Sequence, residues 1–270
     1  MASQALRLGA CKAMSQRPRF YCPAALHPGD ELDLPAGTAR HVQVRRMQPG
    51  DEITLFSGEG GECVAIITRM GRSDVGVRVT QHIDIERELA VRIHLWSGIT
   101  ANERMDWLLE KATELGASTL LPITAERSVL KLKGERSDKK LAHWQAIAVA
   151  ASEQCGRNRV LQVASPLTLS QAIASSAPQI KGTRWLLSLA DGTKSLQEAL
   201  QALPRPAAGQ ALELILLSGP EGGLSPDEEA QALAAGFLPV SLGQRVLRAE
   251  TAPVAVLSAL GLLTSIHSGV

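Results

Sequence analysis

The sequence predicts an α/β protein in which a smaller all-β region precedes a larger region of alternating strands and helices. In the first region, short apolar runs are separated by turn residues, a pattern typical of a small β-barrel. In the second region, strand patterns alternate with helix patterns, which favours a parallel sheet covered on both faces. The length of 270 residues suits two modest domains, and the best boundary lies near residues 82–90.

The first region begins after a segment that we expect to be a disordered extension, residues 1–18. Four basic and no acidic residues in the first 29 also resemble an organelle presequence, an interpretation that we favour less. Met14 stands where an alternative start of translation would fall. The following strands are expected at 30–34, 52–56, 63–67 and 75–79. Gly- and Pro-containing segments at 49–51 and 58–61 lie between them and predict hairpin turns.

The second region has a strand pattern at 91–96 and a helix pattern at 102–115, where apolar residues recur on one helical face. Further strands are expected at 120–123, 184–189 and 212–217, and further helices at 139–154, 195–203 and 225–235. Residues 252–270 carry no formal charge other than a protonated His267. Pro253 and Gly261 interrupt this segment and no basic flank follows it, so we expect a buried helix rather than a membrane span.

Composition excludes several functional classes. The four cysteines, Cys11, Cys22, Cys63 and Cys155, are widely spaced, so we expect a reducing cytoplasmic environment and no structural metal site. No two histidines have metalloprotease spacing. The formal net charge is +1 and aromatic residues make up only 3% of the chain. These averages argue against a protein that binds single-stranded RNA on stacked aromatic side chains.

The charge is nevertheless unevenly distributed. Residues 127–159 hold eight basic and three acidic side chains, whereas 206–270 hold two basic and six acidic ones. A second basic stretch covers 40–46. Such clusters form either a solvated surface or a surface that binds the phosphates of a nucleic acid, and the pattern alone favours neither.

A glycine-rich turn, Gly219–Gly223, follows the strand expected at 212–217. Ligands of α/β proteins commonly bind at the carboxyl ends of strands, where glycine lets backbone amides approach closely. The turn lacks the Gly-Lys-Ser/Thr of a phosphate loop and the spacing of a dinucleotide fingerprint. The turn therefore predicts a ligand site without identifying the ligand.

A second compact motif spans residues 241–252 and contains Arg245 and Arg248, the two basic residues of the acidic C-terminal part. One interpretation is purely structural: Arg248 and Glu250 would form a salt bridge at the start of the last helix, with Thr251 as its cap. This structural role is compatible with a functional one.

Together, residues 217–223 and 241–252 resemble the cofactor site of the SPOUT methyltransferases, and most closely that of the RsmE family. Segments 17–21, 41–51, 111–116, 126–128 and 152–157 fit the same family. The similarity covers essentially the whole chain after Met14. The departures are the N-terminal extension and Gln244 within the second motif.

This resemblance implies a PUA-like β-barrel that binds RNA at 19–87, followed at 88–270 by a SPOUT α/β domain whose C-terminal part forms a trefoil knot. It also implies that knotted loops bind S-adenosylmethionine, that a homodimer completes the active site, and that the last helix is buried in the knot and the dimer interface. The implied activity is methylation of N3 of a specific uridine in 16S rRNA, within the assembled small ribosomal subunit.

The resemblance assigns candidate residues to each role. Those that would bind the cofactor are Leu217, Ser218, Gly219, Pro220, Glu221, Gly222, Gly223, Ser241, Leu242, Gly243, Val246, Leu247, Arg248, Thr251 and Ala252. Those that would contact RNA are Arg17, Arg19, Arg40, His41, Arg45, Arg46, Arg127, Lys131, Lys133, Gln154 and Arg157. Uracil N3 is a weak acid, so we expect Arg248 or Arg19 to stabilise charge on the uracil oxygens, while Glu250 or water takes the proton.

Two alternatives stay open from the sequence. The chain could be a non-catalytic RNA-binding factor of ribosome assembly, although the intact 219–223 and 242–252 motifs speak against it. It could also be a SPOUT methyltransferase that acts on another RNA position, because only the resemblance selects uridine N3.

Overall fold

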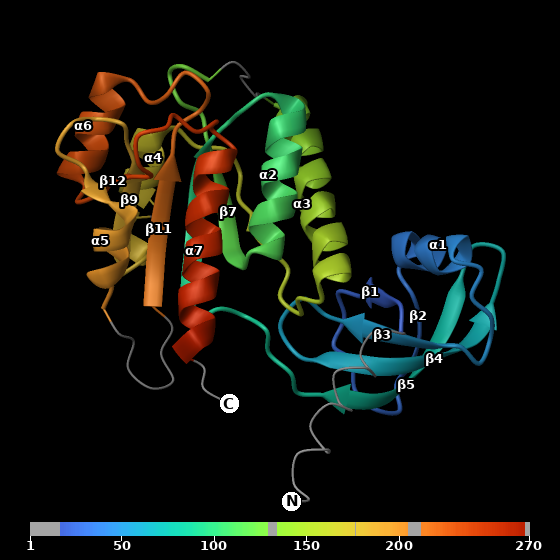
Figure 1. Ribbon diagram of the computed structural model, residues 1–270. Coiled ribbons are helices and arrows are strands. Elements are labelled where there is room, and N and C mark those ends of the chain that lie inside the picture. The colour runs from blue at the N-terminus through green and yellow to red at the C-terminus, as the bar shows by residue number, and fades with distance from the viewer. Residues whose placement is uncertain (1–16, 129–133, 176, 205–211, 268–270) are drawn as a thin grey trace, which may run out of the picture. The chain divides into compact units, whose positions relative to one another are not determined.

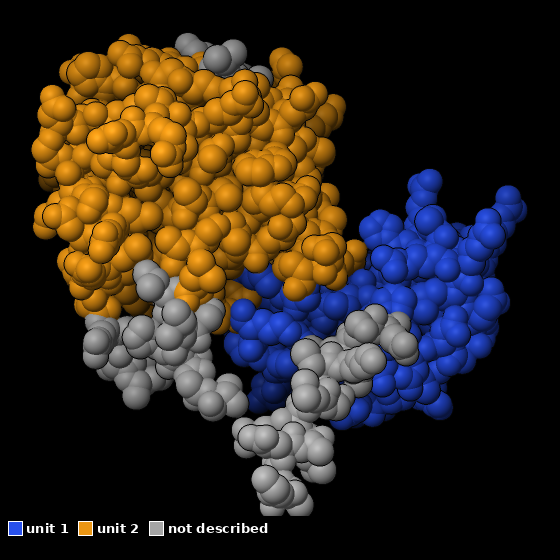
Figure 2. Space-filling model, viewed as in Figure 1, with its two compact units in different colours: residues 1–87, 156–159 blue, residues 88–155, 160–270 orange. Residues whose placement is uncertain are grey.

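A computed structural model describes residues 17–128, 134–175, 177–204 and 212–267, the last five by their backbone only. The chain divides into two compact units (Figure 2): unit 1 comprises residues 1–87 and 156–159, and unit 2 comprises 88–155 and 160–270. The segment Gly156–Arg159 thus belongs to unit 1, although the alternation of elements along the sequence had assigned it to the second region.

Unit 1 is built on a five-stranded sheet. In spatial order its strands are β1 (Arg19–Tyr21), β3 (Glu52–Phe56), β4 (Glu62–Met70), β5 (Val75–Ile83) and β2 (Glu31–Asp33). β1 pairs with β3 in parallel and the other pairs are antiparallel. The helix α1 (Ala36–Val44) contributes Val42 to an apolar core that also contains Phe20, Ile53 and Ile67.

Unit 2 is built on a seven-stranded sheet in which every pairing is parallel, as the sequence predicts. In spatial order its strands are β10 (Lys194–Ser195), β12 (Leu238–Ser241), β9 (Thr183–Leu187), β11 (Leu212–Ser218), β6 (Val91–Gly98), β7 (Ala117–Ile123) and β8 (Gln162–Val163). The central β11 is apolar on both faces, since Leu214, Ile215, Leu216 and Leu217 are all fully buried. A strand of this kind requires helices on both sides of the sheet.

Those helices form two layers (Figure 1). α2 (Asn102–Glu114), α3 (Glu135–Cys155) and α7 (Thr251–His267) cover one face, and α4 (Leu169–Ser175) and α6 (Pro226–Ala234) cover the other. The short η1 (Ala177–Gln179) packs beside α4, and α5 (Leu196–Gln201) packs at β10 and β12. Trp96, Leu217 and Phe237 belong to the core between the sheet and the α4–α6 layer.

The uncharged C-terminal segment forms α7, which packs against α2, β6 and β11. Val256, Leu257 and Leu260 are buried in this contact, whereas Leu262 is 71% exposed. Within the described part of the chain, no helix combines the length and the apolar character that a membrane span needs.

Candidate cofactor site

Four neighbouring strands of unit 2 end at the same edge of the sheet, because they are parallel. The chain leaves β6 at Gly98, β9 at Leu187, β11 at Ser218 and β12 at Ser241. A cavity of about 510 Å³ lies at this edge, bounded by the segments that follow β9, β11 and β12. Its volume falls within the range of small-molecule sites, and its position is where parallel sheets usually bind ligands.

The glycine-rich loop after β11 has a conformation that few other residues would permit. A Cβ atom on Gly219 would lie 3.0 Å from the backbone nitrogen of Leu224, and Gly223 has a φ of +69°. The loop ends at Ser225, which caps α6: its hydroxyl accepts from the Glu228 amide while the Glu228 carboxylate accepts from the Ser225 amide. This reciprocal cap fixes where the loop stops and the helix begins.

The end of β6 packs closely against the glycine-rich loop that follows β11. A Cβ atom on Gly98 would lie 2.2 Å from the Pro220 nitrogen, so only glycine lets the two backbones approach this closely. The amide of Ala101 then donates to Glu221 Oε1 over 3.0 Å. The loop is therefore held in place by the connection between β6 and α2, which the sequence motifs did not indicate.

Arg127 also holds the glycine-rich loop, at its C-terminal part. Its guanidinium Nη1 donates to the carbonyl oxygens of Gly222 and Leu224, both at 3.2 Å. A Cβ atom on Gly222 would meet the Arg127 Cβ at 3.0 Å. The family resemblance assigned Arg127 to RNA binding, but in the structure this arginine lines the cavity and holds the glycine loop through two hydrogen bonds.

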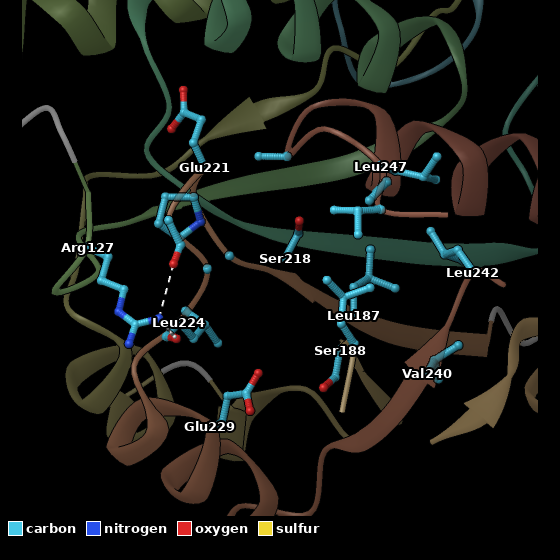
Figure 3. A pocket seen from close by; sticks show the side chains of 18 of the residues that line it. Arg127, Leu187, Ser188, Ser218, Glu221, Leu224, Glu229, Val240, Leu242 and Leu247 are labelled. Atoms are coloured by element: carbon cyan, nitrogen blue, oxygen red, sulfur yellow. Dashed lines mark hydrogen bonds between the residues drawn. The ribbon is translucent and has the colours of Figure 1, made fainter. Parts of the chain in front are cut away.

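The cavity has an apolar side and a polar side (Figure 3). Leu187, Val240, Leu242 and Leu247 gather at one side, while Arg127, Glu221 and Glu229 lie at the other. The apolar side suits a flat, weakly polar ring. The Glu229 carboxylate on the polar side suits a ligand that carries positive charge.

The loop after β12 returns to the same edge and leads into α7. Glu250 is buried, at 7% exposure, and its Oε2 atom has no hydrogen-bond partner among the described residues. The expected salt bridge to Arg248 is not formed: Glu250 Oε1 lies 3.9 Å from Arg104 Nε instead. Arg248 is exposed, and its carbonyl accepts from the amides of Thr251 and Ala252 at the start of α7.

Most residues proposed for the cofactor meet at the cavity. Those that line it are Ser218, Gly219, Pro220, Glu221, Gly222, Gly223, Leu242, Val246, Leu247 and Ala252. Leu217, Ser241, Gly243, Arg248 and Thr251 do not line it, although each adjoins a lining residue or lies within one of the two motifs.

The sequence missed the other lining residues, which are Leu187, Ser188, Leu189, Leu224, Pro226, Glu229, Val240, Arg245 and Ala249. Leu224, Pro226 and Glu229 directly follow the glycine turn, so extending the motif by one helical turn would have found them. Leu187–Leu189 carry no turn signal, and the strand expected at 184–189 ends earlier, at Leu187.

The residues proposed for RNA are spread over both units. In unit 1, Arg40, His41, Arg45 and Arg46 are exposed on and after α1, and Arg17 is half-exposed beside Glu52. In unit 2, Gln154 is exposed near the end of α3. Lys131 and Lys133 lie outside the described residues.

Two of the proposed arginines are placed differently. Arg157 is only 5% exposed, so a direct contact of its side chain with RNA, as the sequence analysis expected, does not fit its burial. Arg19, a candidate for both catalysis and RNA binding, is engaged within unit 1: it pairs with Glu62 at 2.5 Å and donates to Asn158 Oδ1 at 2.7 Å. Its guanidinium also lies over the ring of Phe56.

Comparison with protein families gives two matches. Residues 87–261 match a family described as the RNA methyltransferase domain, and residues 34–80 match the RNA methyltransferase PUA domain. The first match lies in unit 2, apart from residues 87 and 156–159, and includes both cavity-lining motifs. The second lies within unit 1.

Individual proteins agree with these matches. The chain is 32% identical over 230 residues to the ribosomal RNA small subunit methyltransferase E of Bacillus subtilis, covering 84% of this chain and 88% of that protein. A methyltransferase of Legionella pneumophila, solved with bound cofactor SAM, superposes with a TM-score of 0.83 at 34% identity, over 92% of this chain and 98% of the other. The ribosomal RNA small subunit methyltransferase E of Neisseria gonorrhoeae, solved with S-adenosyl methionine, gives 0.81 at 34% identity over the same shares. The chain therefore belongs to the RNA methyltransferase family of the ribosomal RNA small subunit methyltransferase E proteins.

Proposed function

We propose that this chain, an S-adenosylmethionine-dependent ribosomal RNA methyltransferase by family, methylates N3 of one uridine of 16S rRNA in the assembled small subunit. The observation that carries the proposal is the cavity formed by the two motif loops at the carboxyl edge of the unit 2 sheet. Relatives that match over most of this chain are named for action on the small-subunit RNA, and two of the solved relatives hold the cofactor.

The residues of the cavity fit S-adenosylmethionine. The leucine and valine side chains at the apolar side would take the adenine ring, and the glycine loops would offer backbone groups to the adenine and the ribose. Glu229 places a carboxylate opposite a cofactor that carries a sulfonium and an ammonium group. We assign the fifteen cofactor residues of the sequence analysis to this site, with the additional lining residues beside them.

The cofactor supplies a methyl group on a positively charged sulfur and leaves as a neutral thioether, so no residue has to protonate the leaving group. The demand on the protein is to hold uracil N3 in line with that methyl group. Arg248, exposed and next to the cavity-lining Leu247 and Ala249, would stabilise negative charge on the uracil oxygens. Glu250, or water, would accept the N3 proton. Arg19 is kept as an alternative to Arg248 for the charge on uracil.

RNA would be held through its phosphates rather than by stacking. Arg40, Arg45 and Arg46 present positive charge on the surface of the PUA-like unit 1. Gln154 and Arg17 would add polar contacts. Contacts of this kind position an RNA and make its binding dependent on salt.

The family resemblance supports three further parts of the proposal. The domains are a disordered extension at 1–18, the RNA-binding domain at 19–87 and the methyltransferase domain at 88–270. The C-terminal part forms a trefoil knot, in line with the return of the chain after β12, across β9, to place α7 against β11 and β6. The protein acts in the cytoplasm as a homodimer.

Calorimetry with S-adenosylmethionine separates a methyltransferase from a non-catalytic assembly factor. Binding at micromolar to submillimolar concentration supports the enzyme, whereas absence of binding at millimolar ligand favours the assembly factor. The Arg248→Ala variant tests the catalytic assignment: we expect a large loss of methylation that persists at saturating cofactor. Full methylation by this variant would remove Arg248 from the mechanism.

A further inference from the structure

The two loops that line the cavity each carry one glutamate, and both glutamates face the same arginine. Arg104 Nη1 lies 3.4 Å from Glu221 Oε1, in the loop after β11, and Arg104 Nε lies 3.9 Å from Glu250 Oε1, in the loop before α7. Arg104 belongs to the first turn of α2, and its amide donates to the Ala101 carbonyl. The arginine therefore sits on a regular element that follows β6 directly.

Arg104 does not line the cavity, and neither does Glu250. Any effect of Arg104 on a bound cofactor must therefore pass through the loops. Glu221 itself lines the cavity, and the neighbours of Glu250, Ala249 and Ala252, line it too. A shift of either glutamate would move atoms of the cavity wall.

The charge of Glu250 has to be compensated because its side chain is buried. Glu250 is 7% exposed and its Oε2 atom has no hydrogen-bond partner among the described residues; of the cations in those residues, Arg104 is the one within 4 Å of its carboxylate. A buried carboxylate that loses its cation has to be rehydrated or neutralised, and both require the surrounding backbone to move. Glu221 is better compensated, because it also accepts from the Ala101 amide over 3.0 Å.

We propose that Arg104 is a positioning residue that ties the glycine loop to the loop before α7 and thereby holds the cofactor cavity in its binding geometry. The inference rests on the proposed function, since it concerns the same cofactor site. Arg104 provides one cation on α2, and each of the two loops contacts it through one carboxylate, that of Glu221 or that of Glu250.

The test is the affinity for S-adenosylmethionine, measured by calorimetry on the full chain at a temperature where every variant is folded by circular dichroism. Arg104→Ala is expected to bind the cofactor about tenfold more weakly than the wild type, in the range set by loss of one partly buried ion pair. In methylation assays its KM for the cofactor should rise by a similar factor and by more than kcat falls. Arg104→Lys, which keeps the charge, should recover most of the affinity.

The chain offers a matched control in Arg92. It pairs with Glu213 at 3.4 Å, the same distance as Arg104 to Glu221, and the exposures of both side chains are similar. This pair joins the first residues of β6 and β11, at the end of the strands away from the cavity. Arg92→Ala, which breaks an ion pair of the same length and similar exposure, should leave the cofactor affinity unchanged.

The outcomes of these measurements separate the proposed function from the positioning role of Arg104. If wild-type protein binds no S-adenosylmethionine, the proposed function fails, and the role of Arg104 fails with it. If wild type binds and Arg104→Ala binds equally well, or if Arg104→Lys is as weak as Arg104→Ala, the positioning role is wrong while the function stands. If Arg104→Ala does not fold, Arg104→Gln, which keeps the length and polarity of the side chain, takes its place in the same comparison.

Discussion

At the residue scale, the Glu62 carboxylate shows how unit 1 compensates a buried charge. Glu62 pairs with Arg19 at 2.5 Å and with Arg87 at 3.0 Å. Burial by itself raises the pKa of this carboxyl, but the hydrogen bonds from Arg87 and Arg19 outweigh it and leave the pKa below its ordinary value of 4.5. The ionised form is therefore favoured by folding.

This lowered pKa predicts an acid-sensitive unit 1. A carboxyl whose folded pKa is depressed stabilises the fold above its unfolded pKa, and the stabilisation is lost as the pH falls through the folded value. We expect the unfolding free energy to be level from pH 7 to about 5 and to decrease below about 4.5. Glu62→Gln should be less stable at neutral pH and should lose part of that decrease. Chemical denaturation across this pH range measures both, and an unchanged pH profile in Glu62→Gln would contradict the assignment.

The Glu229 carboxylate is expected to affect which ligand the cavity prefers. It lies on α6, lines the cavity, and faces its polar side (Figure 3). A negative charge there favours the sulfonium of S-adenosylmethionine over S-adenosylhomocysteine, which lacks this charge. We expect Glu229→Gln to lower the preference for the charged ligand by about threefold, as calorimetry with both ligands would show.

The control for Glu229 is Asp227→Asn on the same turn of α6. Asp227 is exposed and does not line the cavity, so its neutralisation changes the charge of the helix without changing that of the wall. An equal change of ligand preference in both variants would show that the effect is long-range and would remove Glu229 from the site.

The ion pairs between side chains were the feature that could be predicted least well from the sequence. The motifs identified Glu221 and Glu250, but nothing in the sequence joins them to Arg104, because the pairing depends on how three strands lie beside one another. The same holds for Arg19 and Arg157: both lie in stretches rich in basic residues, and only the structure shows that one pairs with Glu62 and that the other is buried.

At the element scale, the site depends on one close approach between the end of β6 and the loop after β11. Gly98→Ala would place a methyl group 2.2 Å from the Pro220 nitrogen, where the backbone cannot yield easily. We expect the variant to lose about 1–3 kcal/mol of stability and to bind S-adenosylmethionine much more weakly. Chemical denaturation and calorimetry would measure the two effects.

Gly37→Ala is the matched substitution for Gly98→Ala. Gly37 lies in α1 with open space around its Cα, so the added methyl group meets nothing and favours the helix by up to about 1 kcal/mol. If Gly98→Ala were as well tolerated as Gly37→Ala, the close approach between β6 and the loop would not constrain the site.

Long, regular elements were predictable and short ones were not. The helix pattern at 102–115 corresponds to α2 and the apolar run at 212–217 to β11, since both carry a clear period or a continuous apolar stretch. The sequence missed α1, where Arg40, His41 and Arg45 obscure an amphipathic face that buries only Thr38, Ala39 and Val42. It also missed β12, whose four residues include Pro239.

At the scale of the whole molecule, the order of the strands could not be read from the chain. β11 lies between β9 and β6, so residues about 120 apart in sequence form adjacent strands. Periodicity finds the strands but carries no information on their neighbours. The alternation of strands and helices predicted the parallel sheet, and the family resemblance supplied the methyltransferase and PUA-like domains; the structure and the comparisons then bear these out.

The proposed homodimer gives a prediction at this scale. Leu262 of α7 is 71% exposed, and the resemblance assigns this helix to the dimer interface. We expect the 28.7 kDa chain to sediment as a dimer at micromolar concentration and Leu262→Glu to sediment as a monomer. Leu233→Glu, at an exposed apolar position of α6, is the control and should remain dimeric. A monomeric wild-type protein would contradict the proposal.

The central claim is that this chain methylates N3 of a uridine in 16S rRNA. The most direct test incubates the purified protein and S-adenosylmethionine with small ribosomal subunits from cells that lack this modification, followed by mass spectrometry of the rRNA nucleosides. The account predicts that 3-methyluridine appears in 16S rRNA only when protein and cofactor are both present. Absence of 3-methyluridine, or a methyl group on another nucleoside, would contradict it.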